Sequence, residues 1–268
     1  MVIIIIVALL VVLYLFSLRC RRGHEGLAAL RGWKYAHRGL HGENRPENSM
    51  AAFRAALEGG YGIELDIHLL RDGNLAVIHD SSLKRTAGVD INIEDLVTED
   101  LEKYHLEGTD ETIPAFSQVL ELFAGKAPLI VELKAERKNC AALAEAACKM
   151  LDSYQGPYCI ESFDPRCIMW LKKHRPDIIR GQLSRNFMKT ESPVPAIVRF
   201  LMTHQLENFM IVPDFVAYRY ADRKNLSNFL VRKLWGVQGV SWTIRSQEDL
   251  EIAEKEGYLP IFEAFRAE

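Results

Sequence analysis

The sequence predicts an α/β protein: a TIM-type (β/α)8 barrel with an antiparallel hairpin after its second strand, preceded by one N-terminal transmembrane helix. Three observations support this fold class. From residue 33 onward, apolar β-rich runs alternate with segments of helical periodicity, which is typical of βαβ units around a parallel sheet. A turn of only four residues, 71–74, joins the second run to the third. An uncharged apolar segment opens the chain.

Nine strand-like runs are expected along the domain. They lie at 33–37, 62–70, 75–80, 127–134, 158–163, 179–184, 209–215, 237–244 and 259–265. Helical spacing of apolar residues fills most of the intervals between them. In the first helix Asn48 or Ser49 is expected to cap the start and Gly59 to mark the end, and another helix is expected within 246–257.

The short turn explains why nine strands can form an eight-stranded barrel. Parallel neighbours need a crossover of a dozen or more residues, so the second and third runs are expected to pair antiparallel. With the turn centred on Asp72 and Gly73, Asp66 would lie directly opposite His79. The other eight strands can then close a barrel whose chemistry lies at the carboxyl ends of its strands. A doubly wound open sheet is the alternative, although no glycine-rich phosphate loop follows the first strand.

The first residues predict a membrane anchor. Val2 to Leu18 is an uncharged run of 17 residues. As a helix this run would reach about 25 Å, within the range that spans a bilayer. Basic residues follow it, at Arg19, Arg21, Arg22 and Arg31. Positive charge on that side, without a clear cleavage signal, predicts a single-pass membrane protein whose barrel domain lies in the cytoplasm. The expected divisions are a transmembrane anchor at 1–18, a juxtamembrane linker at 19–32 and the barrel domain at 33–268.

Overall charge and cysteine content exclude some classes of protein. Lys and Arg number 33 and Asp and Glu 36, which gives a formal net charge of −3. Nucleic-acid binders usually carry a strong basic excess, so we expect no nucleic-acid partner. The 5 cysteines show no C-x-x-C spacing, which predicts neither a disulfide framework nor a zinc site and fits a reducing compartment.

Paired charges occupy the ends of two expected strands. Glu64 and Asp66 are two residues apart on one strand, and Glu132 and Lys134 repeat this spacing on another. Side chains two residues apart on a strand point to the same face. Inward carboxylates are costly unless they are paired or bind a cation. Three carboxylates without a cysteine favour one hard divalent cation, Mg²⁺ or Ca²⁺. A buried salt bridge of Glu64 or Glu132 with Lys134 is the structural alternative.

Histidines are expected at two further strand ends. His37 and His79 could serve as base and acid, because histidine titrates near neutral pH. Arg38, Lys134 and a metal ion would stabilise negative charge at phosphorus. Gly39 would leave room for a ligand to approach the backbone. This set of groups suits the cleavage of a phosphodiester.

Several short motifs together resemble the glycerophosphodiester phosphodiesterase family. They are HRG…PENS (37–49), IELDIHLLRDG (63–73), VIHD (77–80), L-x-RT-x-G (83–88), VELK (131–134) and SWT (241–243). Each motif is weak alone, but their order and spacing agree with the family over most of residues 33–268.

The resemblance implies a role for each of these positions. The acid/base histidines are His37 and His79. The phosphate-binding side chains are Arg38 and Lys134. The metal ligands are Glu64, Asp66 and Glu132. The residues that line the substrate pocket are Phe163 and Trp242, and those that would stabilise the active-site loop are Glu47 and Asn48.

The resemblance also implies a reaction. It is the metal-dependent hydrolysis of glycerophosphodiesters, such as glycerophosphocholine, glycerophosphoethanolamine or a lysophospholipid, to an alcohol and glycerol 3-phosphate. Two alternatives stay open: a phosphoinositide-type phospholipase C that forms a cyclic phosphate, and a non-catalytic anchored sensor of glycerophospho-compounds. The chain departs from the family pattern at Ile244-Arg245 and at 262–265, where Thr-Asp-x-Pro is usual. These departures concern the identity of the substrate rather than the reaction.

Overall fold

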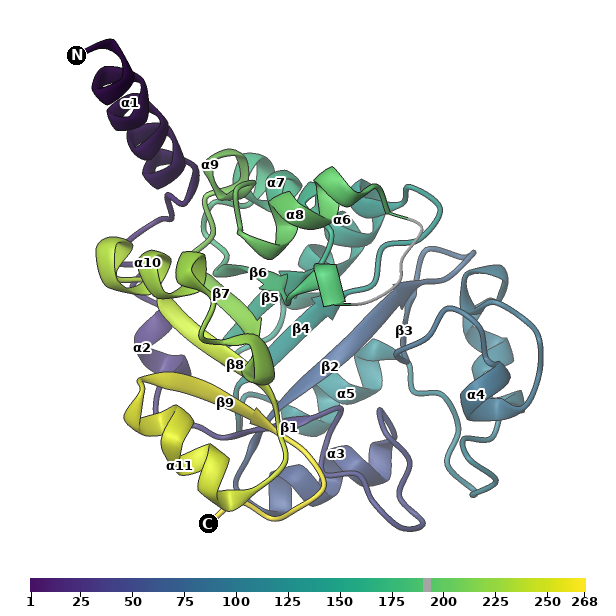
Figure 1. Cartoon of the computed structure of the whole chain (residues 1–268). Coiled ribbons are helices and arrows are strands. Elements are labelled where there is room, and N and C mark those ends of the chain that lie inside the picture. Colours follow the sequence, from purple (N-terminus) through teal and green to yellow (C-terminus); the bar gives the residue numbers. More distant parts are fainter. Residues whose placement is uncertain (190–193) are drawn as a thin grey trace.

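A closed barrel of parallel strands forms the centre of the molecule. The computed structural model describes residues 1–189 and 194–268 (Figure 1). The parallel strands are β1 (Tyr35–His37), β2 (Gly62–Leu69), β4 (Leu129–Leu133), β5 (Tyr158–Ser162), β6 (Arg180–Ser184), β7 (Phe215–Arg219), β8 (Gln238–Ile244) and β9 (Tyr258–Phe262). Because β1 pairs with both β2 and β9, the sheet closes on itself. The predicted TIM-type barrel is confirmed.

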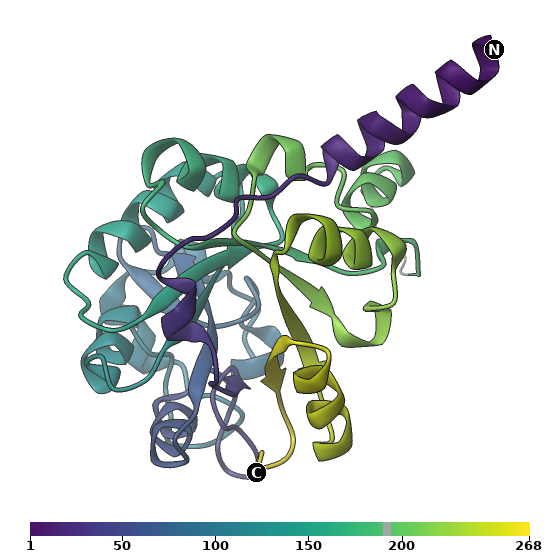
Figure 2. The same cartoon turned by 90° about the vertical axis from the view of Figure 1, so that its left-hand side faces the viewer.

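Helices surround the barrel and connect its strands (Figure 2). The longer ones are α3 (Met50–Glu58), α5 (Phe116–Phe123), α6 (Cys140–Leu151), α7 (Pro165–His174), α8 (Ala196–Thr203), α10 (Leu226–Trp235) and α11 (Gln247–Lys255). Short turns of helix are α2 (Leu27–Leu30), α4 (Lys84–Ala87) and α9 (Asn208–Ile211). The 3₁₀ turns are η1 (Ile93–Asp95), η2 (Thr98–Lys103), η3 (Phe187–Lys189) and η4 (Tyr220–Asp222). Of the two caps considered for α3, Ser49 accepts the hydrogen bond from the Ala52 amide.

The strand β3 (Leu75–Val77) lies antiparallel to β2, in a register different from the predicted one. Ile67 pairs with Val77, and the Ile78 amide donates to the Asp66 carbonyl, so Ile78 and not His79 stands opposite Asp66. The turn has three residues, closed by the Leu70 amide on the Asn74 carbonyl, with Gly73 at a φ of 85°. Three-residue hairpin turns need such a left-handed residue, and they move the register by one position. His79 therefore lies beyond the strand, in the loop at the barrel mouth.

The sixth barrel strand, β7, lies later in the chain than predicted. The apolar run at 209–215 forms α9 and a turn, and the strand begins at Phe215. Val212 has a φ of 46°, and Pro213 has no amide hydrogen to give to a neighbouring strand. These two residues interrupt the extended backbone that the apolar composition predicts.

The helix α1 (Val2–Ser17) projects from the barrel, and none of its residues is buried (Figure 2). Within residues 1–189 and 194–268, no helix has both the length and the apolar character needed to cross a membrane. The predicted transmembrane anchor at 1–18 is therefore not supported. The 16 residues of α1 reach about 24 Å, less than the ~30 Å of a bilayer hydrocarbon core. The following segment packs on the barrel, where Arg21 forms an ion pair with Asp214.

Glu207 places a carboxyl group inside the fold and gives a testable pH dependence. Its side chain is 6% exposed, and neither carboxylate oxygen has a hydrogen-bond partner among the described residues. Burial raises its pKa from 4.5 to about 7. The folded state therefore holds this proton more tightly than the unfolded state. The carboxyl consequently destabilises the fold increasingly as pH rises from 4.5 to 7.

Replacing Glu207 by glutamine should remove this cost. We expect Glu207→Gln to increase the free energy of unfolding at pH 8 by up to about 3 kcal/mol and to change it little near pH 4.5. Urea unfolding followed by circular dichroism at both pH values measures the difference. The matched control is Glu121→Gln on the exposed surface of α5. An equal effect of Glu207→Gln on the free energy of unfolding at the two pH values would contradict a raised pKa of Glu207.

Candidate active site

A small cavity lies at the carboxyl end of the barrel strands. Its volume is about 40 Å³, and it is lined by His37, Arg38, Glu64, His79, Glu132, Lys134, Glu161, Phe163, Leu183, Trp242 and Ile261. Eight of the nine predicted site residues are among these, and the ninth, Asp66, contacts Arg38 and Lys134. The structure thus brings together all nine residues. Their roles in the reaction stay predictions.

Three buried carboxyl groups converge in this cavity. Glu64 and Asp66 come from β2 and Glu132 from β4, and ligand oxygens from the three lie within 4.8 Å of one another. The parallel register of β2 and β4 puts Asp66 beside Glu132. Burial, with the charge of Asp66 next, raises the pKa of Glu64 well above its usual value, and burial raises that of Glu132 to about 7. A hard divalent cation would relieve this crowding, so the donor set fits Mg²⁺ or Ca²⁺.

Two cations balance Asp66. The Lys134 Nζ atom lies 3.0 Å from Asp66 Oδ1 and 2.7 Å from Glu132 Oε1, and Arg38 Nε lies 3.3 Å from Asp66 Oδ2. Asn48 also donates to Asp66 Oδ2. Burial alone would raise the pKa of Asp66, but Lys134 and Arg38 hold it well below its usual value. The salt bridge considered as the structural alternative is thus present between Glu132 and Lys134, within the same cluster.

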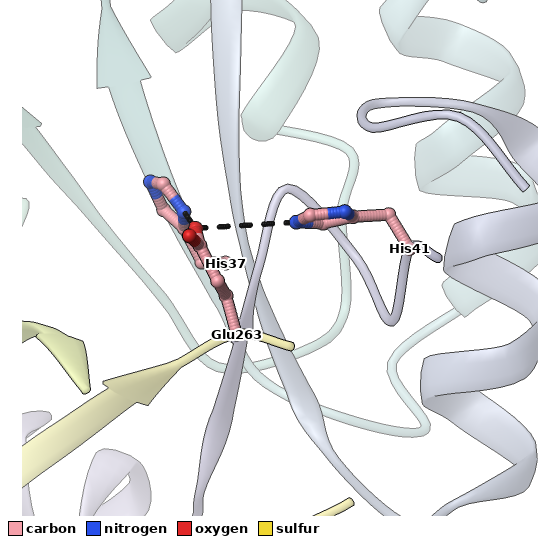
Figure 3. Close-up of side chains that lie close together, drawn as sticks. All are labelled: His37, His41 and Glu263. Atoms are coloured by element: carbon pink, nitrogen blue, oxygen red, sulfur yellow. Dashed lines mark hydrogen bonds and ion pairs between the residues drawn. The ribbon is translucent and has the colours of Figure 1, made fainter. Parts of the chain in front are cut away.

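Glu263 holds His37 in place (Figure 3). The Nδ1 atom of His37 lies 2.5 Å from Glu263 Oε2, and its Nε2 atom lies 3.8 Å from Glu64 Oε2. Arg245 donates to the other oxygen of Glu263, and His41 Nε2 lies 4.0 Å from Oε2. Burial lowers the pKa of His37, while its hydrogen bond to Glu263 acts in the opposite direction. A carboxylate can only accept a hydrogen bond, so the Nδ1 atom of His37 carries the proton. The other ring nitrogen, Nε2, is then the one that faces the cavity.

The backbone after His37 is arranged around this cluster. Arg38 has a φ of 54°, in the left-handed region, and its amide donates to Glu64 Oε2. Gly39 follows with a φ of 78°. A Cβ atom there would lie 2.9 Å from Ala52, so this glycine allows the loop to approach α3. The expectation that Gly39 makes room for a ligand stays a prediction.

A chain of alternating charges connects His79 to Arg38. The Nδ1 atom of His79 lies 2.6 Å from Asp80 Oδ1, and Arg85 on α4 donates to both Asp80 and Glu47. Glu47 in turn accepts from Arg38 at 2.9 Å. Burial lowers the pKa of His79, and its hydrogen bond to Asp80 opposes this effect. The loop role predicted for Glu47 agrees with this position between two arginines.

Two aromatic side chains form one wall of the cavity. The rings of Phe163 and Trp242 meet edge to face with their centroids 5.5 Å apart. Trp242 Nε1 donates to the Ala217 carbonyl, and Lys134 Nζ lies 6.0 Å from the centre of the Phe163 ring. Both aromatic residues therefore lie where the sequence predicts a substrate-facing wall.

Sequence reasoning missed Glu161 and Glu263. Glu161 on β5 is buried beside Glu132 in the parallel register, and burial raises its pKa well above the usual value. Its spacing of two residues from Phe163 is a signal that could have identified it. Glu263 follows the last barrel strand and lies within residues 262–265, where the chain departs from the family pattern. An acidic residue at a strand end was the available signal.

A model of the glycerophosphoryl diester phosphodiesterase family matches residues 37–262, which include all nine predicted site residues. This chain belongs to that family. The family and the matching relative described next are named for the hydrolysis of phosphodiesters. This chain is accordingly a phosphoric diester hydrolase.

A curated relative supports this membership, and a solved structure shares the fold. The chain is 30% identical over 232 residues to a glycerophosphodiester phosphodiesterase of Caldanaerobacter subterraneus, covering 83% of this chain and 89% of that one. Lysophospholipase D GDPD1 of Homo sapiens is 38% identical over 112 residues, which cover 37% of this chain and 35% of that protein. A phosphodiesterase of Oleispira antarctica, solved in complex with the product sn-glycerol-3-phosphate, has the same fold. Its TM-score is 0.69 at 21% identity, with 86% of this chain and 92% of that one covered.

Proposed function

We propose that this hydrolase cleaves glycerophosphodiesters to an alcohol and glycerol 3-phosphate, using two histidines and a divalent cation. The observation that carries the proposal is a single cavity at which the three carboxyl groups, both histidines, Arg38 and Lys134 converge. The names of the relatives support the same reaction class.

The two histidines are arranged alike for proton transfer. In each ring a carboxylate accepts from Nδ1, Glu263 for His37 and Asp80 for His79, so Nε2 is the nitrogen left to exchange a proton. One imidazole takes a proton from the attacking water molecule as its oxygen bonds to phosphorus, and the other donates a proton to the alkoxide oxygen whose bond to phosphorus breaks. A lowered pKa keeps the ring that acts as base able to accept a proton near neutral pH.

The charged residues hold the phosphate between these rings. Arg38 and Lys134 bind its non-bridging oxygens. A divalent cation, held by Glu64, Asp66 and Glu132, would supply further stabilisation of negative charge there. The cavity is small, so the rest of the diester extends out of it along Phe163 and Trp242. This geometry suits glycerophosphocholine, glycerophosphoethanolamine or a lysophospholipid.

Phosphorus NMR of the products tests this function. The purified chain is incubated with each of these diesters and Mg²⁺ or Ca²⁺, with and without EDTA. We expect glycerol 3-phosphate to accumulate from the glycerophosphodiesters in a reaction that EDTA stops. For a lysophospholipid, cleavage of the same phosphorus–headgroup bond is detected as free choline and lysophosphatidate, in which the glycerol 3-phosphate keeps its acyl chain. A lasting cyclic phosphate would favour the phospholipase C alternative, and no chelator-sensitive turnover of any diester would favour the sensor.

The place of the enzyme in the cell is also a proposal. A membrane location with the barrel on the cytoplasmic side rests on the apolar α1 and on the arginines that follow it, Arg19, Arg21 and Arg22. Fractionation of cells that express the full chain tests the membrane location. Protease protection of intact cells and of vesicles tests on which side of the membrane the barrel lies.

A further inference from the structure

A basic hollow lies between α10 and the end of α11, outside the barrel. Its volume is about 500 Å³, and it is lined by Arg223, Lys224, Leu226, Phe229, Arg232, Lys233, Lys255, Glu256 and Tyr258. Five of these side chains are cationic and one is acidic, although the whole chain has a net charge of −3. This α10–α11 hollow shares no residue with the active-site cavity.

Part of this positive charge has no counterion within the described structure. Arg223 pairs with Glu256 at 3.0 Å, and Arg232 stacks on Tyr258 with its guanidinium carbon 3.6 Å from the ring centre. The described residues offer no ion pair to Lys224 or Lys233, and both are exposed. An anion that entered the hollow would therefore meet two lysines whose charge is not already used.

Apolar side chains lie next to these lysines. Leu226 is 62% exposed and Phe229 is 53% exposed. Together with Lys233 they follow one face of α10 at helical spacing, as residues i, i+3 and i+7. Exposed apolar residues flanked by lysines are typical of helices that lie in the interfacial layer of a membrane.

The helix α1 leaves the barrel from the same side of the molecule. Tyr14 on α1 shares a 2.8 Å hydrogen bond with Ser227 on α10, and Arg22 donates to the Trp235 carbonyl at the other end of α10. Figure 1 shows α9 and α10 beside the base of α1, and His204 at the end of α8 contacts the same Ser227. On α8, Ile197 is a further apolar side chain exposed to solvent. Three helices thus present apolar surface in one region.

We propose that this region is a docking surface for an anionic phospholipid bilayer. The helix α1 and the apolar side chains of α8 and α10 enter the interfacial layer, while Lys224 and Lys233 bind the phosphate of a lipid headgroup in the α10–α11 hollow. Charge complementarity selects the anionic lipid, because a zwitterionic surface would satisfy the apolar side chains and attract the lysines much less. The proposal does not depend on the reaction that the barrel catalyses.

Vesicle flotation of the full chain tests this surface. Vesicles of phosphatidylcholine alone are compared with vesicles that also contain about 30% phosphatidylserine. We expect tighter binding to the anionic vesicles, weakened by salt. The double variant Lys224→Glu/Lys233→Glu should bind them at least about 10-fold more weakly and bind the neutral vesicles as before. The double variant Lys126→Glu/Lys149→Glu, on the exposed surface at α5 and α6, makes the same charge change as a control.

Three results would overturn the proposal. One is equal binding of the unaltered chain to both vesicle types. Another is an equal loss in the two double variants, which would show a general charge effect rather than a local site. The third is a changed oligomeric state of Lys224→Glu/Lys233→Glu in light scattering with unchanged vesicle binding, which would make this face a contact between copies. Circular dichroism melting confirms that each variant is folded.

Discussion

Replacing His37 or His79 by alanine should lower the turnover of a glycerophosphodiester by about 10²- to 10⁴-fold. Each ring is held through Nδ1 by a carboxylate, and its Nε2 is the only nitrogen left for proton transfer. Both lie where the strands open at the barrel mouth, outside the apolar core, so the variants should stay folded. Steady-state kcat and KM, with thermal melting of each variant, measure the two effects separately.

His41→Ala is the matched control for these variants. His41 Nε2 lies 4.0 Å from Glu263 Oε2, the oxygen that also accepts from His37, and His41 does not line the cavity. We expect its kcat to change by less than a few-fold. Activity above about a tenth of normal in His37→Ala or His79→Ala would contradict a proton-transfer role for that residue.

Replacing Glu64 by glutamine should raise the metal concentration needed for half-maximal activity by at least about tenfold. The variant keeps the shape of the side chain and removes one of three carboxylates that can reach a common ion. Because burial and the charge of Asp66 raise the pKa of Glu64 well above its usual value, a neutral amide should not destabilise the metal-free fold. Activity titrated with Mg²⁺ and Ca²⁺ after EDTA treatment, together with urea unfolding, measures both expectations.

Glu161→Gln gives the comparison at a neighbouring buried carboxyl group. Glu161 lines the same cavity, but it is not one of the three whose oxygens lie within 4.8 Å of one another. Its metal response should match that of the unaltered chain. An unchanged metal response in Glu64→Gln would remove that residue from the ligand set, and a shifted one in Glu161→Gln would add Glu161.

The positions of the site residues could be predicted because they follow the simplest rule of strand geometry. Glu64 and Asp66, like Glu132 and Lys134, are two residues apart in apolar runs, so each pair shares a face wherever its strand lies. Parallel strands then bring these faces to the same end of a barrel. Nothing beyond alternation and strand order was needed for this part of the site.

Features set by single backbone angles could not be predicted in this way. The left-handed conformation of Gly73 moves the β2–β3 register by one residue, and that of Val212 turns an apolar run into a helix and a turn. The amino-acid composition of these segments does not reveal whether one residue takes the left-handed conformation. The contact of Glu263 with His37 joins the two ends of the domain sequence, and it arises only because β9 closes the barrel against β1.

The ion-pair chain from Asp80 through Arg85 and Glu47 to Arg38 has a consequence for kinetic studies of this loop. Arg85 lines no part of the cavity, yet it contacts a partner of His79 and a partner of Arg38. Energetic effects of substitutions along the chain should therefore not be additive, because each one also releases its neighbour's charge. Losses of activity measured for variants of Glu47 and of Arg85 should therefore be interpreted together, as effects on one coupled group of charges at the barrel mouth.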